Sequence, residues 1–201
     1  MTRKAGSRAL LALTLLLLAA PGAGAFDAAE PFAKGTWIAG FQIGGGIQNN
    51  IEGHGFTTDI TFVTFTPRLT TIPFDPIGSG VLKGAFEVGG EGWFQVFVKP
   101  TVTSAEGLKL ATRYNFLSLG PFVPYVELLA GAGYKNFRPR EVRSNFTFVL
   151  EGGLGLSYFI TPTVAVNGAY RFQHISNGGT TLPNRGWNSD GGVIGISFYI
   201  H

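Results

Sequence analysis

Large apolar side chains alternate with small or polar ones along most of this 201-residue chain. In residues 146–158, phenylalanine, leucine and tyrosine share one face of an extended strand and oppose threonine, glutamate, glycine and serine. A period of two is typical of β-strands, because successive side chains point to opposite faces. Apolar spacing of three or four residues, which would indicate helices, is rare. The pattern therefore predicts an all-β protein.

The alternation predicts eight strands in a single domain that spans residues 26–201. Glycine- and proline-containing turns separate them, and no linker or low-complexity segment divides the chain. The expected strands are residues 36–48, 56–66, 81–97, 108–118, 122–134, 145–159, 163–175 and 188–200.

Residues 1–25 have the composition of a cleaved signal peptide. Arg3, Lys4 and Arg8 precede an apolar stretch, residues 9–20, that is too short to span a bilayer as a helix, and Ala23-Gly24-Ala25 offers a cleavage site. We therefore expect an exported protein. Beyond this segment the acidic and basic residues balance, which argues against a nucleic-acid partner. The chain has no cysteine, so it holds no disulfide and no thiolate metal site.

Two β architectures are compatible with strands that have one apolar face and one polar face. A soluble sandwich would bury the apolar face, whereas a membrane barrel would turn it toward lipid and enclose the polar face. The strands are long enough to cross a bilayer, and glycine repeatedly lies opposite the apolar face. Equal numbers of cations and anions fall on the polar face and could pair in a narrow interior: Lys83, Lys109, Arg113, Arg171, Glu87, Glu91, Glu127 and Glu151. We predict an eight-stranded antiparallel up-and-down transmembrane β-barrel without a pore.

The connection lengths orient such a barrel. With a periplasmic N-terminus, the tight turns 119–121 and 160–162 are periplasmic, and the longer connections 135–144 and 176–188 are external, as is usual for bacterial barrels. The connection 67–80 is a long exception, either a periplasmic excursion or a misplaced strand boundary.

A histidine and a serine fall on the predicted lipid-facing side near the external end of strand 163–175. Val166, Tyr170 and Phe172 mark that side, and His174 and Ser176 continue it by parity. Asn188 has the same parity on the next strand. Serine needs a base to attack an ester, and the base needs an orienting partner. The same residues also suit an ordinary rim turn without chemistry.

The C-terminal half resembles the lipid A 3-O-deacylase (PagL-like) family of outer-membrane barrels. The resemblance rests on these segments: His174-Ile175-Ser176-Asn177-Gly178-Gly179, Pro183-Asn184-Arg185-Gly186, Pro124-Tyr125-Val126-Glu127 with Gly131 and Gly133, Gly153-Leu154-Gly155, and Tyr158-Phe159-Ile160-Thr161-Pro162. It implies an eight-stranded barrel that hydrolyses the acyl ester at position 3 of lipid A with a Ser-His-Glu triad on its outer wall.

Carried onto this chain, the resemblance makes Ser176 the nucleophile and His174 the general base. Asn177 and the backbone near Gly179 would form the oxyanion hole. Asn188 stands where the family has its glutamate, and an amide can orient an imidazole but supplies no negative charge. Asp190, with the same strand parity, is the alternative orienting acid. The chemistry requires no cofactor and no metal.

The expected partners are lipopolysaccharide and outer-membrane lipid, and a homodimer stays open. Arg138, Arg140 and Arg185 lie in external connections where they could contact lipid A phosphates, or they could be ordinary solvated side chains. The alternative functions are a non-catalytic outer-membrane barrel with a structural or ligand-binding role and, with less support, a soluble exported sandwich.

Overall fold

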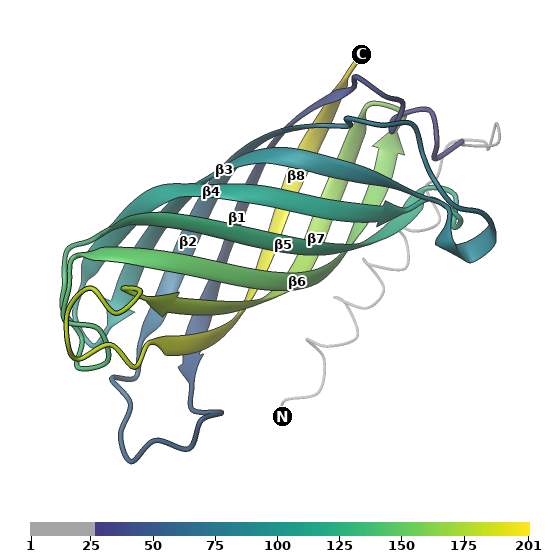
Figure 1. Cartoon of the computed structure of the whole chain (residues 1–201). Helices are drawn as coiled ribbons and strands as arrows, with labels where there is room; N and C mark the ends of the chain where they lie inside the picture. Colours follow the sequence, from purple (N-terminus) through teal and green to yellow (C-terminus); the bar gives the residue numbers. More distant parts are fainter. Residues whose placement is uncertain (1–26) are drawn as a thin grey trace, which may run out of the picture.

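The computed structural model describes residues 27–201 as one closed antiparallel barrel (Figure 1). The predicted signal peptide lies outside the described residues. Each strand pairs with its neighbours in the chain, and β1 pairs with β8 to close the sheet. The strands are β1 (Trp37–Asn49), β2 (Thr61–Thr71), β3 (Gly84–Lys99), β4 (Thr103–Phe116), β5 (Phe122–Lys135), β6 (Phe146–Thr161), β7 (Val164–Ser176) and β8 (Trp187–Ile200). The predicted fold class is confirmed.

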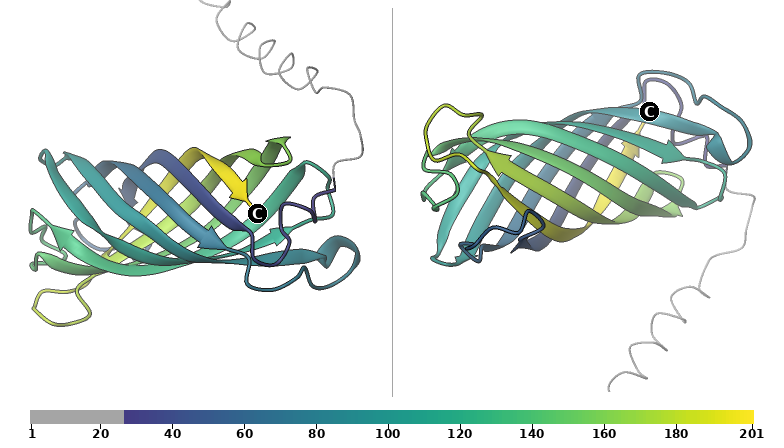
Figure 2. Two further views of the ribbon diagram at one scale, coloured as in Figure 1. Left: turned by 90° about the horizontal axis from the view of Figure 1, so that it is seen from above. Right: turned by 60° about the horizontal axis from the view of Figure 1, so that its bottom comes forward.

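The strands run obliquely to the long axis of the barrel, and both views in Figure 2 show the same tilt. The barrel has two distinct ends. One carries the C-terminus, and there the Thr36 hydroxyl hydrogen-bonds the His201 ring at 3.0 Å. We name it the termini end, and the opposite one the loop end. In Figure 1 the β1–β2 connection projects from the loop end.

Six strands lie close to their predicted ranges. β4 begins five residues earlier than predicted, and β2 begins and ends five residues later. The predicted strand ends just before Pro67, and a proline cannot donate to a sheet ladder. In the barrel, β2 continues through Pro67, which pairs with Phe41 of β1. A Cβ on Gly92 of β3 would lie 2.9 Å from the Pro67 ring, so a glycine opposite leaves room for the proline. The long connection before β3 therefore shrinks to residues 72–83 but remains.

Large apolar side chains cover the outside of the barrel, which we call the outer wall. Every strand contributes at least one that is exposed, including Trp37, Leu69, Phe86, Leu108, Leu128, Leu150, Tyr170 and Ile194. Such a surface is stable in a hydrocarbon environment and is that of a transmembrane barrel rather than of a soluble sandwich. The described residues include no helix that is long and apolar enough to cross a membrane.

The interior is filled in three layers. At the termini end, Phe32 is fully buried and packs its ring edge-on against Phe159 and Tyr199. A second apolar cluster, which includes Trp93, Phe97 and Trp187, fills the loop end. Between them lies a charge layer of eight buried residues: Arg68, Lys109, Arg113, Arg171, Glu87, Glu91, Glu127 and Glu151. Side chains therefore fill the interior, as a barrel of this size requires.

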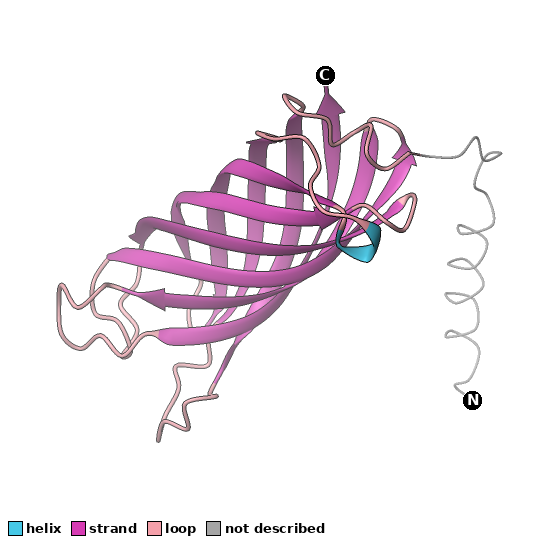
Figure 3. Cartoon of the chain, turned by 45° about the vertical axis from the view of Figure 1, so that its right-hand side comes forward, coloured by secondary structure: helices cyan, strands magenta, loops and turns pink. Residues whose placement is uncertain are grey.

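The sequence prediction assigned one residue, Lys83, wrongly to the interior of the barrel. Lys83 is exposed and lies in the β2–β3 connection, next to the 3-10 helix η1 (Gly80–Leu82) that Figure 3 shows in cyan. Its place is taken by Arg68, which the misplaced end of β2 had assigned to a loop. The Arg68 guanidinium lies 3.0 Å from Glu87 and 3.1 Å from Glu127. The equal number of cations and anions is unchanged.

Candidate active site on the outer wall

His174 and Ser176 both point outward at the end of β7. Their neighbours Gln173, Ile175 and Asn177 are buried inside the barrel, whereas His174 and Ser176 are partly exposed. This is the strict alternation of a strand, so it follows from the positions of the residues alone. Both side chains lie at the loop end, where β7 gives way to the connection 177–186.

The imidazole of His174 is anchored from β8. His174 and Asn188 are direct partners in the β7–β8 register. The His174 Nδ1–H donates to the Asn188 Oδ1 at 2.7 Å. Nε2 therefore keeps its lone pair and is the nitrogen that can act as a base. Gly186 lies against the same ring: a Cβ there would be 3.0 Å from Nε2 and 2.6 Å from Cε1, and its φ of +73° also favours glycine.

The hydroxyl of Ser176 makes no hydrogen bond with His174 within residues 27–201. Two residues apart on a strand, the side chains start about 7 Å from each other at the backbone. The Ser176 backbone is held in place, since its carbonyl accepts a hydrogen bond from the Thr147 hydroxyl at 2.7 Å. A serine-base contact therefore requires rotation of the side chains, and such contacts often tighten only around a substrate.

Asp190 lies on the same wall but is engaged elsewhere. Asn49 Nδ2 donates to one of its carboxylate oxygens at 2.7 Å, and the Tyr170 hydroxyl donates to the other. Its strand partner in β7 is Phe172, not His174. Of the two candidate orienting residues, the structure brings only Asn188 into contact with the imidazole.

A residue that the sequence interpretation missed continues this chain of contacts. Asn188 Nδ2 donates to Glu52 Oε1 at 2.9 Å, and the second Glu52 oxygen lies 2.6 Å from His54 Nε2. Hydrogen bonds from Asn188 and from His54 hold the pKa of the Glu52 carboxyl below its ordinary value. Glu52 comes from the β1–β2 connection, far from β8 in sequence, and no motif surrounds it that could have drawn attention to it.

Asn177 and Gly179, the expected oxyanion donors, build the turn after β7. The Gly179 N–H donates to Asn177 Oδ1 at 3.0 Å, and Asn177 Nδ2 donates to the Thr181 carbonyl at 2.7 Å. The Asn177 N–H donates to Asn184 Oδ1 at 2.8 Å. The Gly179 N–H and the Asn177 side chain therefore hydrogen-bond each other. Only the second hydrogen on Asn177 Nδ2 is left for another acceptor.

The three candidate phosphate-binding arginines are placed differently. Arg185 ties connections together: it donates to the Phe56 carbonyl at 2.7 Å, stacks on the Phe56 ring at 4.3 Å and lies 3.5 Å from Glu141. Arg138 is exposed and donates through Nε to Asn145, and its terminal nitrogens have no partner among residues 27–201. Arg140 is exposed above the Phe56 ring.

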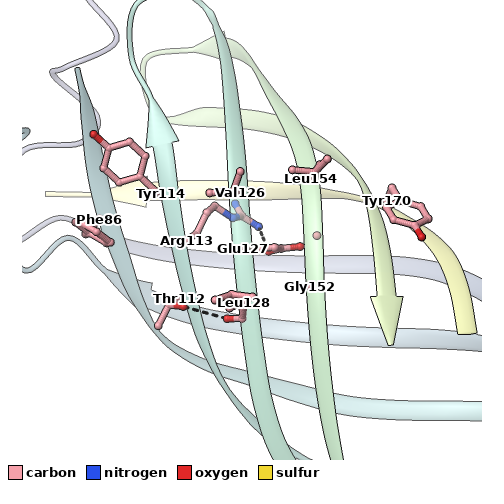
Figure 4. A pocket seen from close by; sticks show the side chains of 11 residues that line it. Phe86, Thr112, Arg113, Tyr114, Val126, Glu127, Leu128, Gly152, Leu154 and Tyr170 are labelled. Atoms are coloured by element: carbon pink, nitrogen blue, oxygen red, sulfur yellow. Dashed lines mark hydrogen bonds and ion pairs between the residues drawn. The ribbon is translucent and has the colours of Figure 1, made fainter. Parts of the chain in front are cut away.

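An apolar hollow of about 500 Å³ lies on the outer wall across β3 to β7, and no residue of the site lines it (Figure 4). Phe86, Tyr114 and Leu154 border it, and Gly152 opens it because glycine has no side chain to fill the wall. Tyr170, four residues before His174 on the same strand, forms its edge, as the figure shows.

Comparison with known proteins identifies a family for this chain. The family model for lipid A 3-O-deacylase (PagL) matches residues 75–197. A crystal structure of the outer membrane enzyme PagL superposes with a TM-score of 0.60 at 14% identity, covering 78% of this chain and 98% of that one.

Two further structures match less closely. Neisserial surface protein A has a TM-score of 0.49 at 15% identity and covers 82% of this chain and 99% of its own. The outer membrane protein OprG from Pseudomonas aeruginosa has a TM-score of 0.44 at 15% identity and covers 84% and 97%. No curated protein matches the sequence. Because the family model covers more than half of the chain, this protein belongs to the lipid A 3-O-deacylase (PagL) family.

Proposed function

We propose that this protein is an outer-membrane esterase that hydrolyses the acyl ester at position 3 of lipid A. The observation that carries the proposal is an outward-facing imidazole whose Nδ1–H is anchored by Asn188, with Ser176 on the same wall. Polar side chains on a lipid-facing surface are costly and mark function by default. Membership of the deacylase family gives that function its chemical class.

In this mechanism His174 Nε2 takes the proton of the Ser176 hydroxyl as its oxygen attacks the ester carbonyl. The tetrahedral oxyanion is proposed to take its hydrogen bonds from the turn after β7, where Asn177 is buried and accepts from the Gly179 N–H, so these donors have to rearrange around a substrate. His174 then returns the proton to the departing sugar oxygen. Water, activated by the same imidazole, releases the chain as a free fatty acid. Asn188 orients the imidazole throughout.

The placement of the site suits a substrate that is itself a membrane lipid. Acyl chains of lipid A would lie alongside the outer wall, and the hollow beside Tyr170 offers apolar surface for one of them. The exposed Arg138 and Arg140 are proposed to contact the phosphates from the connection 136–145. Residues 1–25 would direct the protein out of the cytoplasm toward this membrane.

The direct test is mass spectrometry of lipid A after incubation of purified lipopolysaccharide with the detergent-solubilised protein. We expect the loss of one ester-linked acyl chain and the appearance of the same chain as a free fatty acid. Heat-unfolded protein is the control. Lipid A of unchanged mass would contradict the proposal and favour a barrel with a structural or ligand-binding role.

Replacing Asn188 and Asp190 separately with alanine tests which of them serves the imidazole. Asn188→Ala is expected to lower kcat by about ten- to a hundredfold, because a misplaced general base slows the reaction by that order. Asp190→Ala should change the rate by less than about threefold, as expected for a side chain away from the reaction. Initial rates of fatty-acid release decide the matter, and a larger loss in Asp190→Ala would reverse the assignment.

A further inference from the structure

The orientation of the Asn188 amide decides which nitrogen of His174 carries the proton. With Oδ1 toward the ring, as here, Nδ1 is the donor and Nε2 keeps its lone pair. If the amide turned over, its Nδ2 would donate to Nδ1, and the neutral ring would carry its proton on Nε2. That tautomer cannot accept a proton from serine. An asparagine permits both orientations, whereas a glutamate in its place would permit only the first.

Glu52 removes this ambiguity. Its Oε1 accepts from Asn188 Nδ2 at 2.9 Å. An ionised carboxylate only accepts hydrogen bonds, so it can pair with the NH₂ end of the amide and not with the oxygen end. A glutamate is ionised at neutral pH, and the hydrogen bonds from Asn188 and His54 lower the pKa of Glu52 further. An amide with its NH₂ end toward Glu52 has its oxygen toward His174.

The β1–β2 connection holds Glu52 in this position. His54 Nε2 lies 2.6 Å from the other carboxylate oxygen. The Asn50 side chain makes two hydrogen bonds with the His54 backbone: it donates to the carbonyl at 2.9 Å and accepts from the N–H at 2.9 Å. Glu52, His54 and Asn188 line a small depression at the loop end, distinct from the apolar hollow. Its remaining charged groups are Glu141 and Arg185, which are paired with each other.

We propose that Glu52 is a positioning residue that, through the Asn188 amide, selects the His174 tautomer able to act as a base. In this series of hydrogen bonds from Glu52 through Asn188 to His174, the carboxylate acts on the imidazole through the Asn188 amide, whereas a triad glutamate would contact the imidazole itself. The inference deepens the proposed esterase function and rests on it for its catalytic consequence. Its structural part, the choice of tautomer, holds independently of any activity.

The kinetic test replaces Glu52 with glutamine, which can offer either a donor or an acceptor to the amide. We expect kcat to fall by about ten- to a hundredfold with KM unchanged, the usual cost of losing a residue that orients an active group. Glu52→Asp, which keeps the charge, should lie closer to wild type. Glu106→Gln removes an exposed carboxylate at the same end of the barrel, on β4, and should have no effect. Equal rates for Glu52→Gln and wild type would overturn the proposal.

A second variant separates positioning from simple disruption of the connection. In Asn188→Glu the carboxylate contacts the imidazole directly, so the orientation no longer depends on residue 52. Glu52→Gln in that background should change kcat by less than about twofold, because the coupling between the two positions is gone. If it costs as much as it does in the wild type, Glu52 acts by some route other than Asn188.

Nitrogen NMR of the His174 ring reads the tautomer directly in detergent micelles. The ¹⁵N shifts should report a protonated Nδ1 in the wild type and a mixture of tautomers in Glu52→Gln. Unchanged shifts in the variant would overturn the proposal. If the shifts change as expected while wild-type protein leaves lipid A intact, the esterase function fails and the positioning role of Glu52 stands.

Discussion

Replacing Ser176 with alanine is expected to lower the rate of lipid A deacylation by at least about 10³-fold, as loss of a serine nucleophile does elsewhere. The other hydroxyl on β7 belongs to Tyr170, which lies four residues before His174 and donates to Asp190, so it is not placed to substitute for Ser176. The barrel should fold as before, because the Ser176 hydroxyl forms no hydrogen bond within the described residues. The contact with Thr147 uses the Ser176 backbone carbonyl, which alanine retains.

The measurement is the initial rate of fatty-acid release, with refolding followed by the shift in gel mobility between folded and heated protein. Ser104→Ala is the control: it removes a hydroxyl at the loop end of β4, away from the site, that accepts a hydrogen bond from Asn136 at 2.8 Å. If Ser176→Ala releases fatty acid at the rate of the control, another residue is the nucleophile of that reaction.

The second large effect concerns stability. Arg171 lies at the centre of the charge layer, with Glu91 and Glu127 each 2.8 Å away and Gln42 accepting from its guanidinium at 2.8 Å. Replacing it with methionine leaves four buried carboxylates with three cations. We expect a loss of about 3–5 kcal/mol in the free energy of unfolding, the usual cost of an uncompensated buried charge.

Urea unfolding of the reconstituted barrel, followed by the fluorescence of the buried Trp93 and Trp187, measures this loss. Arg143→Met, which removes an exposed arginine from the connection 136–145, should change stability by no more than about 0.5 kcal/mol. Neutralising Glu151 in the Arg171→Met protein should recover part of the loss, since Arg171 also lies 3.5 Å from that carboxylate. Equal unfolding midpoints for Arg171→Met and Arg143→Met would show that the layer does not stabilise the barrel.

Much of the fold could be predicted because strand periodicity is a local property. Whether His174 or Ile175 faces lipid depends on parity along β7, which any reader of residues 164–176 can count. The same counting placed Asn188 on the outer wall. It did not find the right end of β2, because a proline is compatible with a strand only when the facing strand leaves room for it, as Gly92 does for Pro67.

The charge layer shows the same division. The equal numbers of acidic and basic residues on inward positions could be read from the sequence, but the presence of Arg68 and the absence of Lys83 depend on where β2 and β3 end. Asp190 likewise has the parity of a candidate acid. Only the structure shows that Asn49 and Tyr170 occupy its carboxylate.

The sequence by itself determined that a histidine and a serine share the strand face that carries the large apolar side chains, because the direction of a side chain along a strand repeats every two residues. The tertiary structure alone decided what touches the histidine. Asn188 reaches it through the register of β7 and β8, and Glu52 reaches Asn188 from a connection at the other end of the chain. Closure of the barrel creates that contact by pairing β1 with β8, and no local pattern encodes such a pairing.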